Sequence, residues 1–445
     1  MLEKAQSITP ELLKKFKKDF EKDKVACVMK NAASNTPLSQ LVYVTSSKVG
    51  NSHQFSIDIK TMKATNQKSS GRCWIFAATN LLREIVGKKI NVSNFELSQN
   101  YLAFYDKLEK INYALETVID LCNRDSDDRT LKHIISYPVG DGGQWDMFKS
   151  LVKKYGVVPK NVMDETYGSS NTRESDMLIN NMIRKFASIA CKLKKDGKDE
   201  EIKALKDKYL EDLYRLLVIS FGEPVEKFDF EYVDKDDKYH LVKNLTPLKF
   251  YEKFIGVDID NYVSLINSPT SDKPFYETFT VDYVGNVIGG NDIHYLNLPM
   301  EELKESVLKS LKDGEIVWFG SDCGKFSNRD EGLWDPEQYD YKLSLGLDIL
   351  MNKADMLDYS HSAMNHAMVI TGVNLEKDKP NKWKIENSWG PEVGKSGYYT
   401  ATDKWFDLFV YQVVVNKKYL TEEQKKCLEK KPHHLNPWDL MGTLA

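Results

Sequence analysis

Apolar positions along the chain change from helical spacing in the first half to strand-like spacing in the last third. After Gly71, the run CWIFAATNLLREIVG repeats apolar residues at spacings of three and four, which predicts a buried helix. The run SNFELSQNYLAFYDKLEK predicts another helix, opened by Ser93 with Glu96 as a capping box. Later runs are short, β-branched or aromatic, and separated by turn residues: EIVWFG, HAMVITGV, KWKIENSW and YQVVVN. This order predicts an α+β fold.

Three other segments complete the pattern. From Thr9, ITPELLKKFKKDFEKD predicts an amphipathic helix that packs against the body or a neighbouring subunit. The segment from Leu41 to Ile59 is β-branched and alternating, which predicts extended structure. A polar, Lys-rich region from Asn171 to about Tyr214, with a turn at Gly197, predicts two helices of a solvated insertion.

Composition narrows the class of protein. Apolar residues make up 41% and charged residues 29%, which excludes a wholly disordered, collagen-like or disulfide-scaffold chain. The net charge of −4 provides no basic field for a phosphate backbone, so nucleic acid is not favoured as the main partner. The cysteines form no CxxC pair, and neither a metal site nor a cofactor is predicted. Without a signal-peptide core or an apolar run of about 18 residues, we expect a cytoplasmic protein that is not embedded in a membrane.

Cys73 is the cysteine whose setting favours nucleophilic chemistry. A catalytic thiol needs a helix N-terminus or an imidazolium to hold it as a thiolate. Cys73 follows the flexible run SSGR and opens the predicted buried helix, so its sulfur would face the positive end of the helix dipole. Gln67, six residues upstream, could join the Cys73 backbone N–H in donating to an oxyanion.

A thiolate also needs a base, and the base needs a partner that orients it. His366 begins the apolar run HAMVITG, and Asn387 stands twenty-one residues further on in KIENSWG. The two should lie on neighbouring strands. The remaining histidines are isolated, lie in a polar stretch or form a tail pair, and are interpreted as structural: His53, His133, His240, His294, His361, His433 and His434.

These motifs resemble the papain superfamily, in which a glutamine lies six residues before a Gly-x-Cys-Trp helix start. The resemblance implies that Asn387 accepts a hydrogen bond from the His366 imidazole and that Trp389 screens this bond from water. It also implies that Gly142 and Gly143, in DGGQWDMFKSLVKKYGVVP, expose backbone that pairs with the substrate. The alternative for the two glycines is a simple helix-entry turn.

The whole chain resembles one branch of that superfamily, the bleomycin hydrolase and aminopeptidase C family. Cys73 and His366 are 293 residues apart, which leaves room for insertions beyond a minimal papain-like domain of about 200 residues. The shared marks are QKSSGRCWIFA, DGGQW, VWFGSDCGK, HAMVITG, ENSWG and the final PWDLMGTLA. The implied fold is papain-like, with a helical left domain, a β-barrel-like right domain, large helical insertions and terminal arms.

This resemblance also implies a domain organisation. Its five parts are an N-terminal arm with oligomerisation elements (1–60), a left domain with the nucleophile helix (61–168), a largely helical, hook-like insertion (169–300), a right β domain with the histidine and asparagine (301–420), and a C-terminal arm that enters the cleft (421–445). In the family the terminal carboxylate, here on Ala445, lies near the nucleophile and attracts the ammonium of a peptide's free N-terminus.

The expected function is therefore that of a cytosolic cysteine aminopeptidase, a thiol protease whose partners are peptides with a free N-terminus. By resemblance, it assembles as a homohexamer with its active sites facing a central channel. Two alternatives stay open. One is a thiol endopeptidase with the same triad and an open cleft, and the other is a DNA-binding or scaffolding hexamer, favoured only by the lysines between Lys192 and Lys208.

Overall fold

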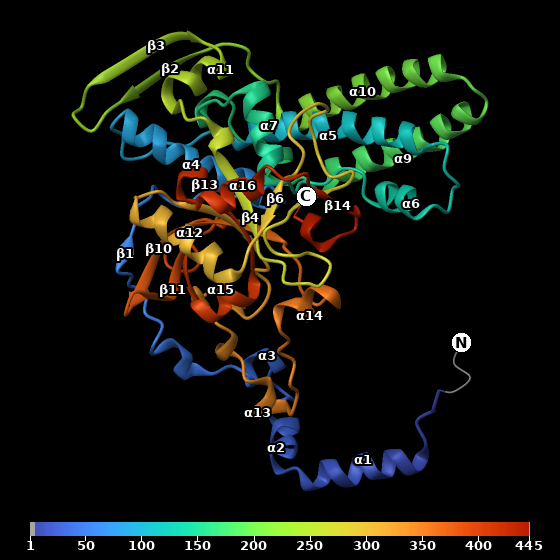
Figure 1. Cartoon of the computed structure of the whole chain (residues 1–445), viewed down its shortest axis with the longest axis vertical. Helices are drawn as coiled ribbons and strands as arrows, with labels where there is room; N and C mark the ends of the chain where they lie inside the picture. Colours follow the sequence, from blue (N-terminus) through green and yellow to red (C-terminus); the bar gives the residue numbers. More distant parts are fainter. Residues whose placement is uncertain (1–4, 445) are drawn as a thin grey trace.

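The structure is a computed structural model that describes residues 5–444. A helical part lies against a part built around a large sheet, and the N-terminal α1 (Pro10–Lys22) projects from the far end of the sheet part (Figure 1). The main helices of the helical part are α4 (Cys73–Lys89), α5 (Gln99–Leu121), α6 (Arg129–Ser136), α7 (Trp145–Tyr155), α9 (Arg173–Lys195) and α10 (Asp199–Phe221). A small hairpin, β2 (Phe228–Val233) and β3 (Tyr239–Leu245), covers one end of it.

The large sheet has the strand order β14-β5-β6-β4-β13-β7-β10-β11-β12-β9-β8, with β1 added to β10. Its strands are β1 (Ile57–Asp58), β4 (Tyr262–Ile266), β5 (Thr278–Val281), β6 (Tyr295–Asn297), β7 (Val317–Ser321), β8 (Ser327–Asn328), β9 (Leu333–Trp334), β10 (His366–Glu376), β11 (Lys379–Glu386), β12 (Tyr398–Thr402), β13 (Val410–Asn416) and β14 (His433–Leu435). In the antiparallel pair β10–β11, Val369 lies opposite Glu386. The start of β10 and the end of β11 therefore meet at one end of the sheet.

Alternation along the strands divides the interior into two apolar cores. Val317 and Phe319 of β7 pack with α12 (Met300–Lys312) and α15 (Asp403–Phe409) on one face of the sheet. Trp318, between them, points to the other face and packs in the core of α4, α5 and α7. This two-residue period is expected for a sheet buried on both faces. It places the start of α4 directly against the sheet.

The predicted capping box at Ser93 is wrong, and α5 begins at Gln99 instead. Ser98 is its N-cap and accepts a hydrogen bond from the Tyr101 N–H over 3.0 Å. The residues before it are extended, because Leu97 forms a β-bridge with Pro159 and the Ser98 N–H donates to the Val158 carbonyl. A tertiary pairing thus prevails over a local capping motif.

The extended structure expected between Leu41 and Ile59 is also mostly wrong. Only β1 pairs with the sheet, opposite Gly372 and Val373. The segment begins at the last residue of α3 (Leu38–Leu41), and the rest consists of an isolated bridge from Tyr43 to Tyr339, a short 3₁₀ helix at Thr45–Lys48, and turns and coil. Ser and Asn side chains satisfy the backbone there, as when the Asn51 amide donates to the Ser47 carbonyl over 2.8 Å.

The N-terminal helix forms as predicted but does not pack on the body. Thr9 caps α1 through a hydrogen bond from the Leu12 N–H over 3.2 Å. Its apolar residues Leu13, Phe16 and Phe20 are exposed. Within residues 5–444, no helix combines the length and the apolarity that crossing a membrane requires.

The expected pair of helices between Asn171 and Tyr214 forms as α9 and α10, joined at Gly197, whose φ is +69°. The pair is not simply a solvated layer, because Ile183, Phe186 and Leu213 are buried in the same core as α5. A disulfide between Cys122 and Cys191, which sequence spacing did not predict, joins the end of α5 to α9. Within the range 169–300, the later residues supply β4, β5 and β6 to the large sheet.

Candidate active site

Cys73 is the first residue of α4, and only 4% of it is exposed. The Ala367 N–H donates to its sulfur over 3.4 Å, so the first turn of the helix contacts the start of β10. The next residue, Trp74, donates its indole N–H to the Asp141 carbonyl over 2.7 Å. The predicted nucleophile therefore lies where the helical part meets the sheet, although it is separated from β10 by almost 300 residues of chain.

His366 and Asn387 lie at the same end of neighbouring strands. The His366 Nε2 and the Asn387 Oδ1 are 2.8 Å apart. Trp389 stacks on the imidazole, with ring centroids 5.0 Å apart and planes inclined by 29°. Since the amide engages Nε2 and fixes the ring, Nδ1 is the nitrogen that remains available to exchange a proton with a thiol.

Burial has opposite effects on the titration of the two reactive groups. It raises the pKa of the Cys73 thiol to about 11, although the Ala367 N–H favours the thiolate. It lowers the pKa of the His366 imidazole to about 4, although the bond to Asn387 favours the protonated ring. Each charge taken alone is therefore disfavoured in the closed site.

Gln67 is buried at the beginning of the loop that leads into α4. Its backbone N–H donates to the Ser388 carbonyl over 2.9 Å, next to Asn387. Its side-chain Nε2 donates to the Ser70 carbonyl over 2.7 Å. A carboxamide nitrogen carries two hydrogens, so one of them remains for a substrate oxygen.

A cleft of about 840 Å³ brings four of the eight predicted site residues together. Cys73, His366, Gln67 and Gly142 line it. The Gly142 carbonyl accepts a hydrogen bond from the Lys110 ammonium. Gly143 lies behind the cleft wall, where an added Cβ would come within 2.5 Å of the Trp74 ring. Gly142 therefore lies on the cleft wall and Gly143 is closely packed behind it, and the expected pairing of these glycines with substrate backbone stays a prediction.

The C-terminal segment reaches the same cleft. Thr443 and Leu444 line it, and the Thr443 hydroxyl donates to the Met364 carbonyl over 2.8 Å. Further back, the Tyr295 hydroxyl donates to the Met441 carbonyl over 3.1 Å. Ala445, the predicted anchor for the substrate amine, lies outside the described residues.

Sequence reasoning missed a set of buried charges beside the nucleophile loop. The Asp141 carboxylate accepts a hydrogen bond from the Gly71 N–H over 2.7 Å and pairs with the Lys107 ammonium over 2.7 Å. The same ammonium pairs with Asp176 of α9. The position of Asp141 directly before the glycine pair is the only local signal, and no spacing rule connects it to Lys107 or Asp176.

A helical part packed on a sheet, with a thiol at the helix start and an imidazole–amide pair at the sheet end, defines a papain-like cysteine peptidase. The Peptidase C1-like family matches residues 7–442, and the chain belongs to this family. Aminopeptidase C from Lactobacillus delbrueckii subsp. lactis is 44% identical over 99% of both chains, and Aminopeptidase C from Listeria innocua is 44% identical over 98% of this chain and 99% of the relative. The crystal structure of PepW from Lactobacillus rhamnosis superposes with a TM-score of 0.97 at 45% identity, covering 99% of this chain and 100% of that one. The resemblance and the papain-like fold predicted from the sequence are confirmed.

Proposed function

We propose that this protein is a cysteine aminopeptidase that removes residues from the free N-terminus of peptides. The enzyme class agrees with the prediction from the sequence and with relatives named Aminopeptidase C that match the full chain. The observation that carries the proposal is the cleft itself, which Cys73 and His366 line together with Thr443 and Leu444 of the C-terminal segment.

The reaction begins with transfer of a proton from the Cys73 sulfur to His366 Nδ1. This transfer creates both charges together, so their mutual attraction and the N-terminal end of α4 offset the burial that disfavours each one alone. The bond to Asn387 holds the imidazole in place through Nε2. Trp389, stacked on the ring, keeps water from that bond.

The thiolate then attacks the carbonyl carbon of the first residue. The Gln67 side-chain amide and the Cys73 backbone N–H donate to the oxyanion that forms. His366 returns its proton to the leaving amine, which yields a thioester between Cys73 and the first residue. Water activated by the same imidazole hydrolyses the thioester and restores the thiol.

The C-terminal segment accounts for the restriction to peptide ends. Leu444 is almost fully buried in the cleft wall, so this segment occupies space that an extended chain on the non-primed side would need. The role of Ala445 as the anchor for the substrate ammonium stays a prediction. So does the assignment of residues 421–445 as an arm that limits the cleft.

Matched peptides with a free and an N-acetylated first residue test the proposal. The free peptide should be cleaved after its first residue, whereas the acetylated peptide should be resistant. Cys73→Ala should abolish cleavage of the free peptide. A truncated variant lacking Leu444 and Ala445 should gain cleavage inside acetylated peptides. Equal cleavage of both peptides by the intact chain would favour the endopeptidase alternative.

We also propose the homohexamer and the cytosolic location that the family resemblance implies. The exposed apolar residues Leu13, Phe16 and Phe20 of α1 support an assembly contact, because water disfavours such a row on a free helix. Light scattering on the purified chain measures the assembly directly. A monomer at micromolar concentration would contradict the hexamer and leave the chemistry of the cleft untouched.

A further inference from the structure

Arg72, the residue directly before Cys73, carries a charge that the proposed chemistry does not use. Its side chain is 2% exposed, and its guanidinium forms a fork with the Glu165 carboxylate, with Nη1–Oε1 at 3.2 Å and Nη2–Oε2 at 2.8 Å. Removing two charges from water costs several kcal/mol per ion before pairing offsets it. A buried pair of this kind beside a nucleophile therefore calls for a functional explanation.

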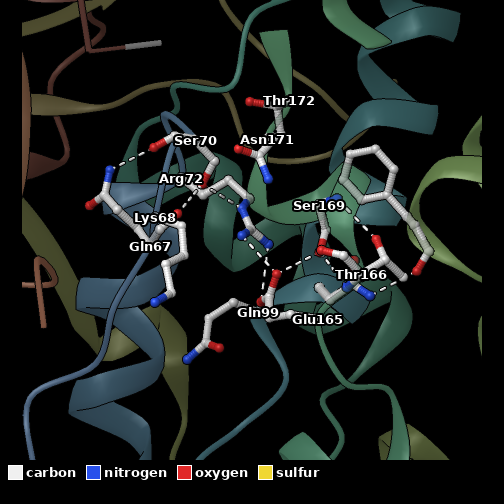
Figure 2. A network of polar contacts seen from close by, with 12 residues as sticks. Gln67, Lys68, Ser70, Arg72, Gln99, Glu165, Thr166, Ser169, Asn171 and Thr172 are labelled. Atoms are coloured by element: carbon white, nitrogen blue, oxygen red, sulfur yellow. Dashed lines mark hydrogen bonds and ion pairs between the residues drawn. The ribbon is translucent and has the colours of Figure 1, made fainter. Parts of the chain in front are cut away.

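The same arginine is connected to the oxyanion donor through one serine. Arg72 Nε donates to the Ser70 hydroxyl over 2.9 Å, and that hydroxyl donates to the Gln67 carbonyl over 2.6 Å. The Gln67 side-chain amide returns to the Ser70 carbonyl over 2.7 Å. Figure 2 shows the resulting chain of contacts, with Arg72 between Ser70 and Glu165.

Glu165 is itself fixed on the far side of the loop. The Ser169 hydroxyl donates to its carboxylate over 2.6 Å, and the Lys160 ammonium lies 3.6 Å from it. Burial alone would raise the pKa of Glu165, but the charge and hydrogen bonds of Arg72 hold that pKa below its ordinary value. The carboxylate is thus ionised at neutral pH and retains the fork.

The pair acts through geometry rather than through its charge on the sulfur. Glu165 neutralises the guanidinium, so the two together impose little net field on Cys73. The fork fixes the Arg72 side chain, and the Arg72 Nε in turn holds the Ser70 hydroxyl. Ser70 is bonded to Gln67 twice, because its hydroxyl donates to the Gln67 carbonyl and its own carbonyl accepts from the Gln67 side-chain amide. An oxyanion donor must be held within a few tenths of an ångström to act in the transition state.

We propose that Arg72 and Glu165 are positioning residues that hold the Gln67 amide in the oxyanion site by way of Ser70. This inference rests on the proposed peptidase function. In this proposal, the polar contacts that hold the loop Gln67–Cys73 determine the rate of acyl transfer. They do not affect the formation of the thiolate.

A double-mutant cycle on hydrolysis of an aminoacyl anilide tests the connection. Gln67→Ala should lower kcat about 100-fold, the cost of losing one oxyanion donor. Arg72→Lys, which keeps the charge and loses the fork, should lower kcat about 10-fold with little change in KM. If Arg72 acts through Gln67, the double variant should fall about 100-fold, as Gln67→Ala does, rather than about 1000-fold. A multiplicative loss would overturn the proposal.

Two further measurements separate positioning from other roles. The pH dependence of Cys73 alkylation by iodoacetamide should be the same in Arg72→Lys and in the wild type, and a shifted profile would show instead that Arg72 acts on the thiolate. Ser70→Ala should reproduce the kcat loss of Arg72→Lys, and a wild-type kcat in that folded variant would remove the proposed link.

Arg83 provides a matched control on the same helix. It is equally buried and pairs with Glu386 over 2.8 Å, but it lies ten residues beyond Cys73. Arg83→Lys should lower the thermal unfolding midpoint as Arg72→Lys does, while kcat stays within about twofold of the wild type. Equal kcat losses in both variants would indicate general destabilisation and overturn the positioning role. If the proposed peptidase function is itself wrong, the Cys73→Ala variant will keep the activity of the wild type, and this result is distinct from the outcomes above.

Discussion

The two sides of the cleft hold their reactive groups in different ways. On the nucleophile side, the loop Gln67–Cys73 is held by side chains, including the fork of Arg72 with Glu165 and the bond from Gly71 to Asp141. On the base side, the backbone ladder of β10 and β7 places His366 opposite Ser321, and Asn387 directly follows β11, which pairs with β10. Single substitutions should therefore have larger effects in the loop than in the strands, except at the reacting groups themselves.

The largest effect is expected at the base. His366→Ala should lower kcat/KM by at least about 10⁴-fold, because the variant loses the imidazole that accepts the thiol proton. Burial raises the pKa of Cys73 to about 11, so the thiol should also be alkylated by iodoacetamide far more slowly at pH 7 than in the wild type. His361→Ala, five residues away, serves as the control and should behave as the wild type. Unchanged alkylation in His366→Ala would mean that this imidazole does not activate the sulfur.

Loss of the second loop anchor should have the next largest effect. Asp141→Asn removes a charge that pairs with Lys107 and weakens the bond to the Gly71 N–H. We expect a loss of about 3 kcal/mol in unfolding free energy, typical of a broken buried pair, together with lower kcat. Urea unfolding and steady-state kinetics measure both.

The exposed pair of Lys153 and Asp260 provides the matching control for this substitution. Asp260→Asn should change the unfolding free energy by no more than about 0.5 kcal/mol. Similar losses in the two variants would show that burial does not distinguish the loop anchor from a surface pair.

The charged framework should also make stability depend on pH. Burial raises the pKa of Asp176 from 3.8 to about 6. The Lys107 ammonium lowers this pKa and the nearby Asp141 carboxylate raises it, but burial is the largest effect. Between these values the folded protein binds more protons than the unfolded chain, so this group lowers stability as pH rises from 4 to 6. The contribution amounts to at most about 3 kcal/mol.

Asp176→Asn should remove that dependence. The unfolding free energy of the variant, relative to the wild type, should therefore rise between pH 4 and pH 6, and urea titrations across this range measure the slope. Parallel pH profiles for the two proteins would contradict the assignment.

The smallest effect is expected within the strands. Thr371 of β10 is fully buried, and its hydroxyl has no hydrogen-bond partner among the described residues. Thr371→Val keeps the shape and removes an unsatisfied polar group, so stability should stay the same or rise by up to about 1 kcal/mol. Thermal unfolding and kcat test this. A kcat loss of more than tenfold would show that the sheet side is as sensitive as the loop.

Part of the candidate site could be predicted because its signals are local. The helix start at Cys73, the strand start at His366 and the motif around Asn387 each stand within a few residues of sequence. The structure brings Cys73 and His366 to one cleft and bonds the buried Asn387 to the imidazole. The framework under the loop has no such signal. Glu165 is far from Arg72 in the chain, and a glutamate in an ordinary polar stretch does not reveal that it will be buried.

The errors have the same origin. Ser93 and Glu96 have the spacing of a capping box, but a bridge between Leu97 and Pro159 delays the helix to Gln99. The bond between Cys122 and Cys191 joins two helices whose approach no local pattern encodes. In each case a contact between distant segments prevailed over a preference of neighbouring residues.

The amino-acid order alone determined the two periodicities, and with them the buried helix after Gly71, the strands of the last third and the family. These features depend on which face of a short segment is apolar, and that is written in neighbouring residues. The tertiary structure alone decided which charges are buried in pairs and what they hold. Such pairs gain their energy only after the chain has removed them from water, so they depend on long-range packing that leaves no periodic trace in the sequence.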